Sequence, residues 1–185
     1  MTLLDAKDAM RRDMRAKLAA MTPTNIAANS AKIVQVLTRD AAWLPPKATV
    51  ALFGGIHGEP DLLPLIPWLL ECHATPVLFG FHDGLLIPHS VKDSTVLQRG
   101  IFGVWMPPEN SPVVPYAQLD VILTPGLAFG RDCMRLGRGR GHFDRLFALP
   151  EVKARRIGVC WECQRVAAVP TEPHDAPMDA VITEG

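Results

Sequence analysis

The segment of the sequence that offers the most chemistry alternates arginines with glycines and ends in an acid. In chain order it consists of Arg135, Leu136, Gly137, Arg138, Gly139, Arg140, Gly141, His142, Phe143 and Asp144. Glycines let backbone N–H groups turn toward a ligand without obstruction by a Cβ atom. Arg138 and Arg140 suit charge-assisted hydrogen bonds to phosphate oxygens, and Asp144 suits a magnesium ion that bridges phosphates. The segment therefore predicts a phosphate-binding loop, with a flexible arginine and glycine turn as the alternative.

The residues around this segment are typical of a strand, a glycine-rich loop and a helix. The apolar run Leu119–Leu123 enters it through Thr124-Pro125-Gly126, and the amphipathic run Phe143–Leu149 follows it. The start of a helix carries partial positive charge, which attracts phosphate. The segment is neither a Walker loop nor a Gly-x-Gly-x-x-Gly fingerprint. Phosphate binding is thus predicted here without either of the common motifs.

Two helices are predicted before the first strand. Apolar residues at helical spacing indicate a helix over residues 3–20, and Thr24 is the expected cap of a second helix that runs to about Thr38. Lys7 and Arg11 are four residues apart, so they share one face of the first helix. This face is either a solvated basic surface or a partner of the phosphate loop.

The first buried strand is predicted at residues 49–53, and it is followed by a turn-rich segment with two acids. These acids are Glu59 and Asp61. Ligands of open α/β sheets gather outside the carboxyl ends of the strands, so both acids are candidates for a site. Asp61 is equally suited to cap a helix over residues 62–72. For Glu59 the sequence leaves a site residue and a surface residue as equal alternatives.

Further apolar runs complete an α/β pattern. Strands are predicted at residues 76–80, 85–87, 157–159 and 180–183. The alternation with helices predicts a single three-layer α/β/α domain, residues 1–185, with a mostly parallel central sheet. The aromatic segment 102–108, which contains Trp105, either lines a site for a flat ring or covers the sheet.

Composition excludes several classes of protein. The 185 residues are 48% hydrophobic, enough for a real core, and 19 basic side chains balance 19 acidic ones, so no global charge favours nucleic acid. No apolar run spans a bilayer, and the polar start does not resemble a signal peptide, so we expect a cytoplasmic protein. The pair Cys160 and Cys163 lacks a second ligand pair for zinc, and we interpret both as small core residues.

Two segments together resemble the signature of the 5-formyltetrahydrofolate cyclo-ligase family, also called methenyltetrahydrofolate synthetases. They are residues 119–129 and residues 135–145. The resemblance extends along nearly the whole chain, because weaker matches occur in the family's order. These matches are Lys7-x-x-x-Arg11, Glu59, Gly103-x-x-x-Pro107, and Val169-Pro170-x-Glu172-x-His174-Asp175-x-x-Met178-Asp179.

The resemblance implies an enzyme that uses ATP and Mg²⁺ to convert 5-formyltetrahydrofolate, with or without a polyglutamate tail, to 5,10-methenyltetrahydrofolate. In the family the formyl oxygen is phosphorylated, N10 attacks the activated carbon, and ADP and phosphate are released. The resemblance implies that Lys7, Arg11 and residues Arg135 to Phe143 hold the triphosphate, with Arg138 and Arg140 acting in catalysis. It assigns Asp144 and Asp175 to magnesium, and Gly54 and Glu59 to folate; Trp105 is a further folate candidate from the aromatic segment. We expect a monomer that binds no nucleic acid and no membrane.

The sequence also departs from the family pattern near the expected folate end. Gly130 replaces an aspartate, Cys133 a glycine and Met106 an acid, while His142-Phe143 replaces two aromatics that commonly end in tyrosine. The alternative is therefore a non-catalytic relative that keeps a nucleotide pocket for binding or regulation. An RNA contact by the arginine and glycine segment is a third interpretation, and the zero net charge argues against it.

Overall fold

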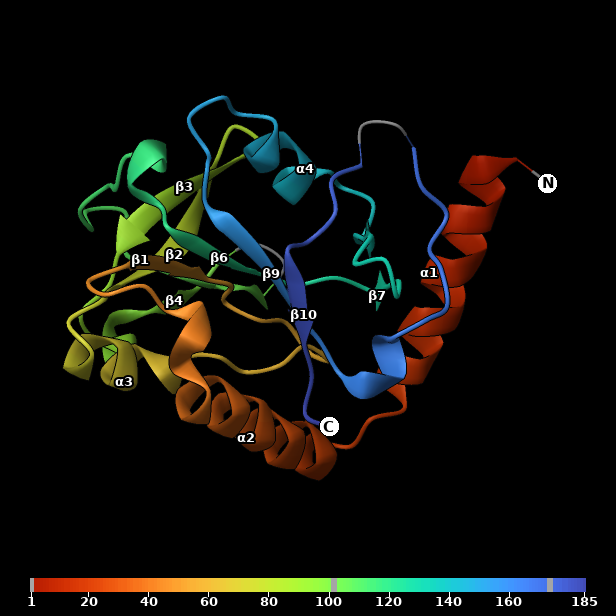
Figure 1. The fold of residues 1–185 in the computed structure, drawn as a ribbon, viewed down its shortest axis with the longest axis horizontal. Coiled ribbons are helices and arrows are strands. Elements are labelled where there is room, and N and C mark those ends of the chain that lie inside the picture. Colours follow the sequence, from red (N-terminus) through yellow and green to blue (C-terminus); the bar gives the residue numbers. More distant parts are fainter. Residues whose placement is uncertain (1, 101–102, 173–174) are drawn as a thin grey trace.

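The central sheet of the computed structural model has the strand order β10-β9-β6-β1-β2-β3 (Figure 1). The structure describes residues 2–100, 103–172 and 175–185, so Phe102 and His174 lie outside the described residues. Five strands run parallel and β3 is antiparallel to β2. The six strands are β1 (Thr49–Leu52), β2 (Thr75–His82), β3 (Leu85–Ser90), β6 (Val121–Thr124), β9 (Arg155–Val159) and β10 (Ala180–Ile182).

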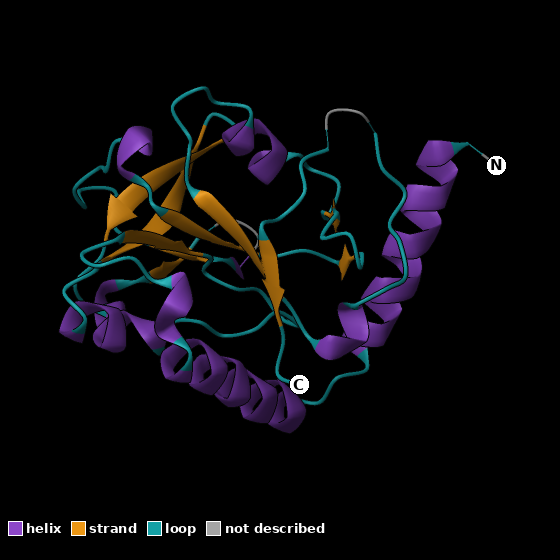
Figure 2. Ribbon diagram, viewed as in Figure 1, coloured by secondary structure: helices purple, strands orange, loops and turns teal. Residues whose placement is uncertain are grey.

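Helices cover both faces of this sheet, as the sequence predicts for a three-layer fold. Figure 2 shows α2 and α3 on one side of the strands and α4 on the other, while α1 stands at one end of the molecule. The helices are α1 (Leu3–Ala19), α2 (Pro23–Arg39), α3 (Leu65–Glu71) and α4 (His142–Phe147). The smaller elements are η1 (Ala41–Trp43), η2 (Ser94–Val96), η4 (Tyr116–Gln118), η5 (Glu162–Gln164), β4 (Gln98–Arg99), β5 (Trp105–Met106), β7 (Ala128–Phe129) and β8 (Arg135–Leu136).

The order in which the chain adds strands to the sheet reverses at β1. The chain passes from β1 to β2 on one side and returns later to β6 on the other, so β1 pairs in parallel with both. Such a switch point leaves a crevice between the loops that follow the two strands. Here those loops begin at Phe53-Gly54 and at Pro125-Gly126. The topology therefore predicts a ligand site between them.

Three local predictions are wrong. Thr22, not Thr24, caps α2: its side chain accepts a hydrogen bond from the backbone N–H of Asn25, and Pro23 takes the first helical position. Asp61 accepts a hydrogen bond from Leu63 N–H in a turn, and α3 begins only at Leu65. The glycine segment is not entered directly from β6, because its first two residues form β8 and pair with β7.

The two cysteines of the C-x-x-C segment differ. Cys160 is fully buried next to β9, as predicted, but Cys163 is exposed. Loss of hydration raises the pKa of both thiols above the ordinary value. Neither thiol therefore has the lowered pKa that a redox cysteine needs.

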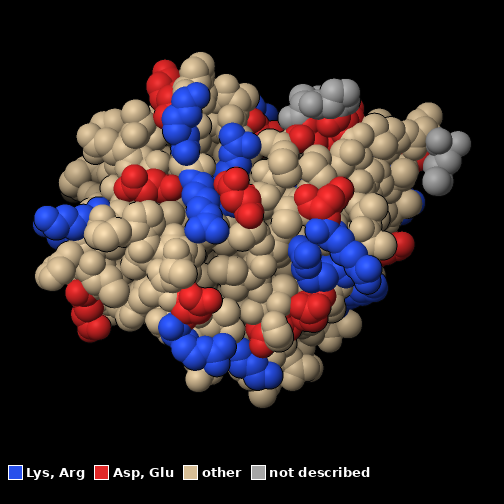
Figure 3. Space-filling view, viewed as in Figure 1, with Lys and Arg blue, Asp and Glu red and all other residues tan. Residues whose placement is uncertain are grey.

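The surface carries mixed charge. On the face drawn in Figure 3, acidic and basic side chains are interspersed among larger neutral areas. Within the described residues, no helix is long and apolar enough to cross a membrane.

Candidate active site

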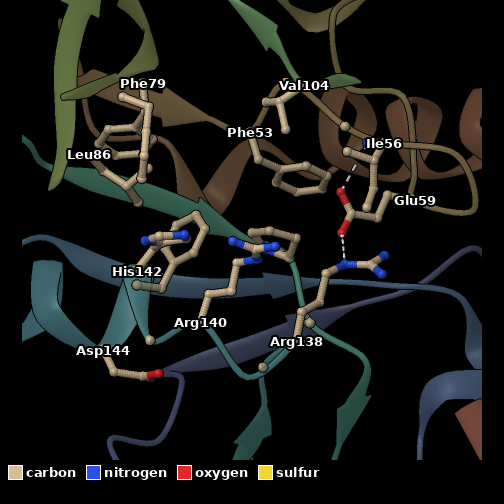
Figure 4. A pocket seen from close by; sticks show the side chains of 18 of the residues that line it. Phe53, Ile56, Glu59, Phe79, Leu86, Val104, Arg138, Arg140, His142 and Asp144 are labelled. Atoms are coloured by element: carbon tan, nitrogen blue, oxygen red, sulfur yellow. Dashed lines mark hydrogen bonds and ion pairs between the residues drawn. The ribbon is translucent and has the colours of Figure 1, made fainter. Parts of the chain in front are cut away.

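A cavity of about 330 Å³ lies where the topology places it. Its walls come from the loops after β1 and β6, from β2 and β3, and from the glycine segment. Figure 4 shows one side of the cavity formed by apolar groups and the other by nitrogen-bearing side chains. The apolar side contains Phe53, Phe79, Leu86 and Val104, and the opposite side contains Arg138, Arg140 and His142. The cavity therefore offers an apolar wall for a ring and cations for an anion.

Helix α1 ties the glycine segment in place. Arg11 Nε donates to the Gly137 carbonyl at 3.2 Å, and Arg15 Nη2 donates to the Arg138 carbonyl at 2.9 Å. Arg15 also lines the cavity, and it is not among the residues predicted for the site. The signal was present, since Arg15 continues the four-residue spacing of Lys7 and Arg11.

Lys7 is buried, so the interpretation of a solvated basic face is wrong for this residue. Its Nζ lies 2.7 Å from Glu172 Oε2 and 2.7 Å from Asp175 Oδ2, and its side chain is 7% exposed. Burial alone would lower the pKa of Lys7, but the hydrogen bonds and charges of the two carboxylates outweigh it and raise the pKa above its ordinary value. Lys7 therefore stays charged at neutral pH.

The two predicted magnesium ligands, Asp144 and Asp175, both interact electrostatically with the buried Arg135. Its Nη2 lies 2.6 Å from Asp144 Oδ1, and its side chain is 6% exposed. Burial lowers the pKa of Arg135, while the charges of Asp144 and Asp175 partly offset that lowering. Both carboxylates thus act on one buried guanidinium, and Lys7 pairs with the second of them.

Glu59 is buried in the wall of the cavity. It lines the cavity with its side chain only 8% exposed, and its Oε1 lies 2.7 Å from Arg138 Nε. Its Oε2 accepts a hydrogen bond from the Ile56 N–H at 3.1 Å. The surface alternative for Glu59 is therefore wrong. A buried carboxylate needs such partners, because desolvation of an unpaired charge is costly.

Two glycines are required for different reasons. A Cβ on Gly54 would lie 1.9 Å from the Trp105 carbonyl oxygen, so glycine permits the close approach of β5 to the end of β1. Gly139 has φ of +100°, and a Cβ there would meet nothing closer than 3.6 Å. Its requirement is therefore backbone conformation.

Trp105 lies in a neighbouring cavity of about 410 Å³. The guanidinium of Arg99 stacks over its ring at 4.1 Å. The two cavities share Gly54, Gly55, Ile56 and Glu59, so this short segment separates them. The structure thus places Trp105 beside the first cavity, and Met106 and Val104 in its wall.

Phe143 is part of the apolar wall. Its ring packs edge-on against Phe79, with centroids 6.0 Å apart, and lies 5.9 Å from the ring of Phe147. The phenylalanine at this position therefore fills space among other phenylalanines.

His142 also lines the cavity, edge-on to Phe81 with ring centroids 4.7 Å apart. Burial lowers the pKa of His142; the Gly84 carbonyl partly offsets this, and the charges of Arg145 and Arg140 add to the lowering. His142 is therefore neutral at neutral pH.

The residues fit a magnesium ion only in combination with phosphate. Among the described residues, no group of three or more histidines, cysteines and acids is placed to hold a metal. Magnesium in phosphoryl-transfer sites needs just one or two carboxylates, because phosphate and water supply the other oxygens. Asp144 lines the cavity and Asp175 acts on the same buried Arg135, so these two carboxylates are the candidates for that smaller requirement.

Fold and cavity together define an α/β protein with a cleft for an anionic, ring-bearing ligand at the carboxyl edge of a parallel sheet. The model of the 5-formyltetrahydrofolate cyclo-ligase family matches residues 4–184. The chain belongs to this family, and the sequence-based expectations of family, fold class and ligase are confirmed.

Relatives agree over most of the chain. The 5-formyltetrahydrofolate cyclo-ligase of Escherichia coli K12 is 34% identical over 73% of this chain and 77% of its own length. That of Mycolicibacterium smegmatis is 33% identical over 73% of each chain. The solved 5,10-methenyltetrahydrofolate synthetase of Aquifex aeolicus matches with a TM-score of 0.83 at 29% identity, covering 96% of this chain and 89% of that chain. A Mycoplasma pneumoniae synthetase structure, at 21% identity and a TM-score of 0.78 over 97% of this chain and 99% of its own, supports the fold.

Proposed function

We propose that this protein, as a single ATP- and folate-binding domain, converts 5-formyltetrahydrofolate to 5,10-methenyltetrahydrofolate with release of ADP and phosphate. The observation that carries the proposal is the cavity in which Glu59, Arg138 and Arg140 face an apolar wall. Phosphoryl transfer chiefly requires positioning and charge neutralisation, and Arg138 and Arg140 supply both without a protein nucleophile.

Each part of the site has a role in this reaction. Arg138 and Arg140 neutralise the phosphoryl group as it passes to the formyl oxygen, and Glu59 and the apolar wall hold the folate ring. Arg11 supports the triphosphate indirectly by holding the loop at the Gly137 carbonyl, and Lys7 does so by pairing with Asp175. Asp144 and Asp175 would hold a magnesium ion, which would supply additional positive charge to the phosphates. N10 then attacks the activated formyl carbon, phosphate leaves as the ring closes, and the proton of N10 is released.

Three further properties belong to the proposal. The protein acts in the cytoplasm as a monomer that binds no nucleic acid, and it accepts its folate with or without a polyglutamate tail. The balanced charge of 19 basic and 19 acidic residues supports the absence of nucleic acid.

The test is the growth of methenyl-product absorbance from 5-formyltetrahydrofolate, with and without ATP and magnesium. We expect growth only with all components. A folded protein that binds ATP but forms no product above a no-enzyme control would instead support the non-catalytic alternative.

Replacing Arg140 with alanine is expected to weaken ATP binding by about tenfold or more, the scale of one lost hydrogen bond to a charged group. Binding of the folate alone should stay near that of the unmodified protein, because Arg140 is assigned to phosphate. Calorimetric titration with each ligand measures both. Arg12→Ala is the control, since this arginine is exposed on α1 and does not line the cavity. An unchanged ATP affinity in Arg140→Ala would remove the phosphate assignment.

A further inference from the structure

The geometry points to Arg138 as a positioning residue that links the folate and nucleotide ends of the site. We propose that its Nε–H holds Glu59 while its Nη2 donates to the terminal phosphate of the nucleotide, so that each ligand strengthens binding of the other. This inference rests on the proposed function and extends it, because it makes the two binding events dependent on one guanidinium.

Both carboxylate oxygens of Glu59 are held by groups of the protein itself. Oε1 accepts from Arg138 Nε at 2.7 Å and Oε2 from the Ile56 N–H at 3.1 Å, as the dashed lines of Figure 4 show. A carboxylate has lone pairs for about four hydrogen bonds, so Glu59 keeps acceptor capacity for N–H donors of a folate ring. Its orientation toward such donors depends on where Arg138 holds it.

Arg138 has a donor that the protein leaves unused. Because Oε2 of Glu59 turns to Ile56, the carboxylate engages the guanidinium through Nε alone. Nη2 of Arg138 is buried and has no hydrogen-bond partner among the described residues. Buried donors in folded proteins nearly always have a partner, so an unpaired donor on a residue that lines the cavity is a candidate to bind a ligand acceptor. A phosphate oxygen suits a guanidinium donor.

The backbone of Arg138 is anchored independently of its side chain. Arg15 holds the Arg138 carbonyl and Arg11 holds the neighbouring Gly137 carbonyl, both from α1. The side chain therefore bridges two fixed points, the loop and the segment that carries Glu59. A phosphate that binds Nη2 stabilises the guanidinium position that holds Glu59, which lowers the cost of keeping Glu59 oriented toward the folate. By linkage, the folate must raise nucleotide affinity by the same factor.

The experiment measures directly the factor by which the nucleotide changes the affinity for the folate. The affinity for 5-formyltetrahydrofolate is determined by calorimetry in magnesium buffer, alone and with saturating adenylyl imidodiphosphate, whose terminal phosphate is not transferred. We expect the unmodified protein to bind the folate about fivefold or more tightly with the analogue, the lower end of typical coupling. ADP, which lacks the terminal phosphate, should produce little change.

Two variants test whether the coupling depends on the hydrogen bonds that Arg138 makes to both sides or only on its positive charge. Arg138→Lys keeps the positive charge but loses the fork of donors, and Glu59→Gln keeps the shape but loses the charge of the pair. In both, the coupling factor should fall toward one. Arg12→Lys, at an exposed position of α1 outside the cavity wall, is the matched control and should keep full coupling. Thermal unfolding of each variant establishes that it is folded.

The outcomes distinguish this inference from the proposed function. Binding of both ligands with no change in folate affinity, or full coupling in Arg138→Lys, overturns the link through Arg138 and leaves the proposed function standing. Failure of the unmodified, folded protein to bind the analogue or the folate overturns the proposed function and this inference with it.

Discussion

Replacing Asp144 with asparagine is expected to reduce product formation at ordinary magnesium concentrations by about a hundredfold or more, the scale for removal of one charge-stabilising group from a site. An amide is a poorer ligand than a carboxylate for a hard cation. The substitution also removes the charge that pairs with the buried Arg135 at 2.6 Å. The measurement is initial rate against magnesium concentration, and raised magnesium should restore part of the activity.

The pairing with Arg135 requires a control for stability. The asparagine oxygen can still accept from Arg135, so we expect a folded protein with a lowered melting temperature. Asp13→Asn, at an exposed position of α1 outside the cavity wall, should leave both melting temperature and rate near those of the unmodified protein. A fully active Asp144→Asn enzyme at low magnesium would show that Asp144 serves only as the partner of Arg135.

Replacing Gly54 with alanine is expected to destabilise the fold by about 1–3 kcal/mol, the usual cost of forcing an extra group into packed structure. The added Cβ would lie 1.9 Å from the Trp105 carbonyl oxygen and 2.8 Å from the Trp105 nitrogen, and backbone atoms cannot rotate away. Activity should fall as well, because Gly54 lines both cavities. Thermal or denaturant unfolding measures the first effect and the methenyl assay the second.

Gly84→Ala provides the comparison for this steric prediction. Gly84 has φ of +80°, and no atom lies within 4 Å of the position that a Cβ would take, so alanine there costs only backbone strain. We expect a loss of about 1 kcal/mol, the scale for one left-handed residue, with product formation retained. Equal activity in Gly54→Ala and the unmodified protein would show that β5 moves without disturbing the site.

The elements of the sheet and the chemistry of the loop could be predicted from the amino-acid sequence. The buried runs at β1, β2, β6 and β9 are visible as short apolar segments, because parallel strands are covered on both faces. The alternation of arginine with glycine is likewise a local feature of the chain. The prediction of a site at the carboxyl ends of the strands followed from the α/β pattern.

The boundaries of the helices and strands depended on neighbouring residues and pairing partners, which the periodicity of apolar residues does not reveal. The cap of α2 at Thr22, the late start of α3 at Leu65 and the β7–β8 hairpin each arise from a proline, a turn or a pairing partner. These choices differ by small free energies, and the surrounding structure decides among them.

The pairing of charges in the site became visible only in the folded chain. Lys7 pairs with Asp175 across 168 positions of the chain, and Arg138 pairs with Glu59 across 79. Spacing along a helix or strand carries no information about such contacts, because they depend on the order of strands in the sheet. The burial of Glu59, the separate cavity of Trp105 and the contact of Arg15 with the loop have the same origin. Residue types thus indicated that cations and acids belong to the site, and folding determined their partners, because desolvation makes a buried charge costly unless an opposite charge lies beside it.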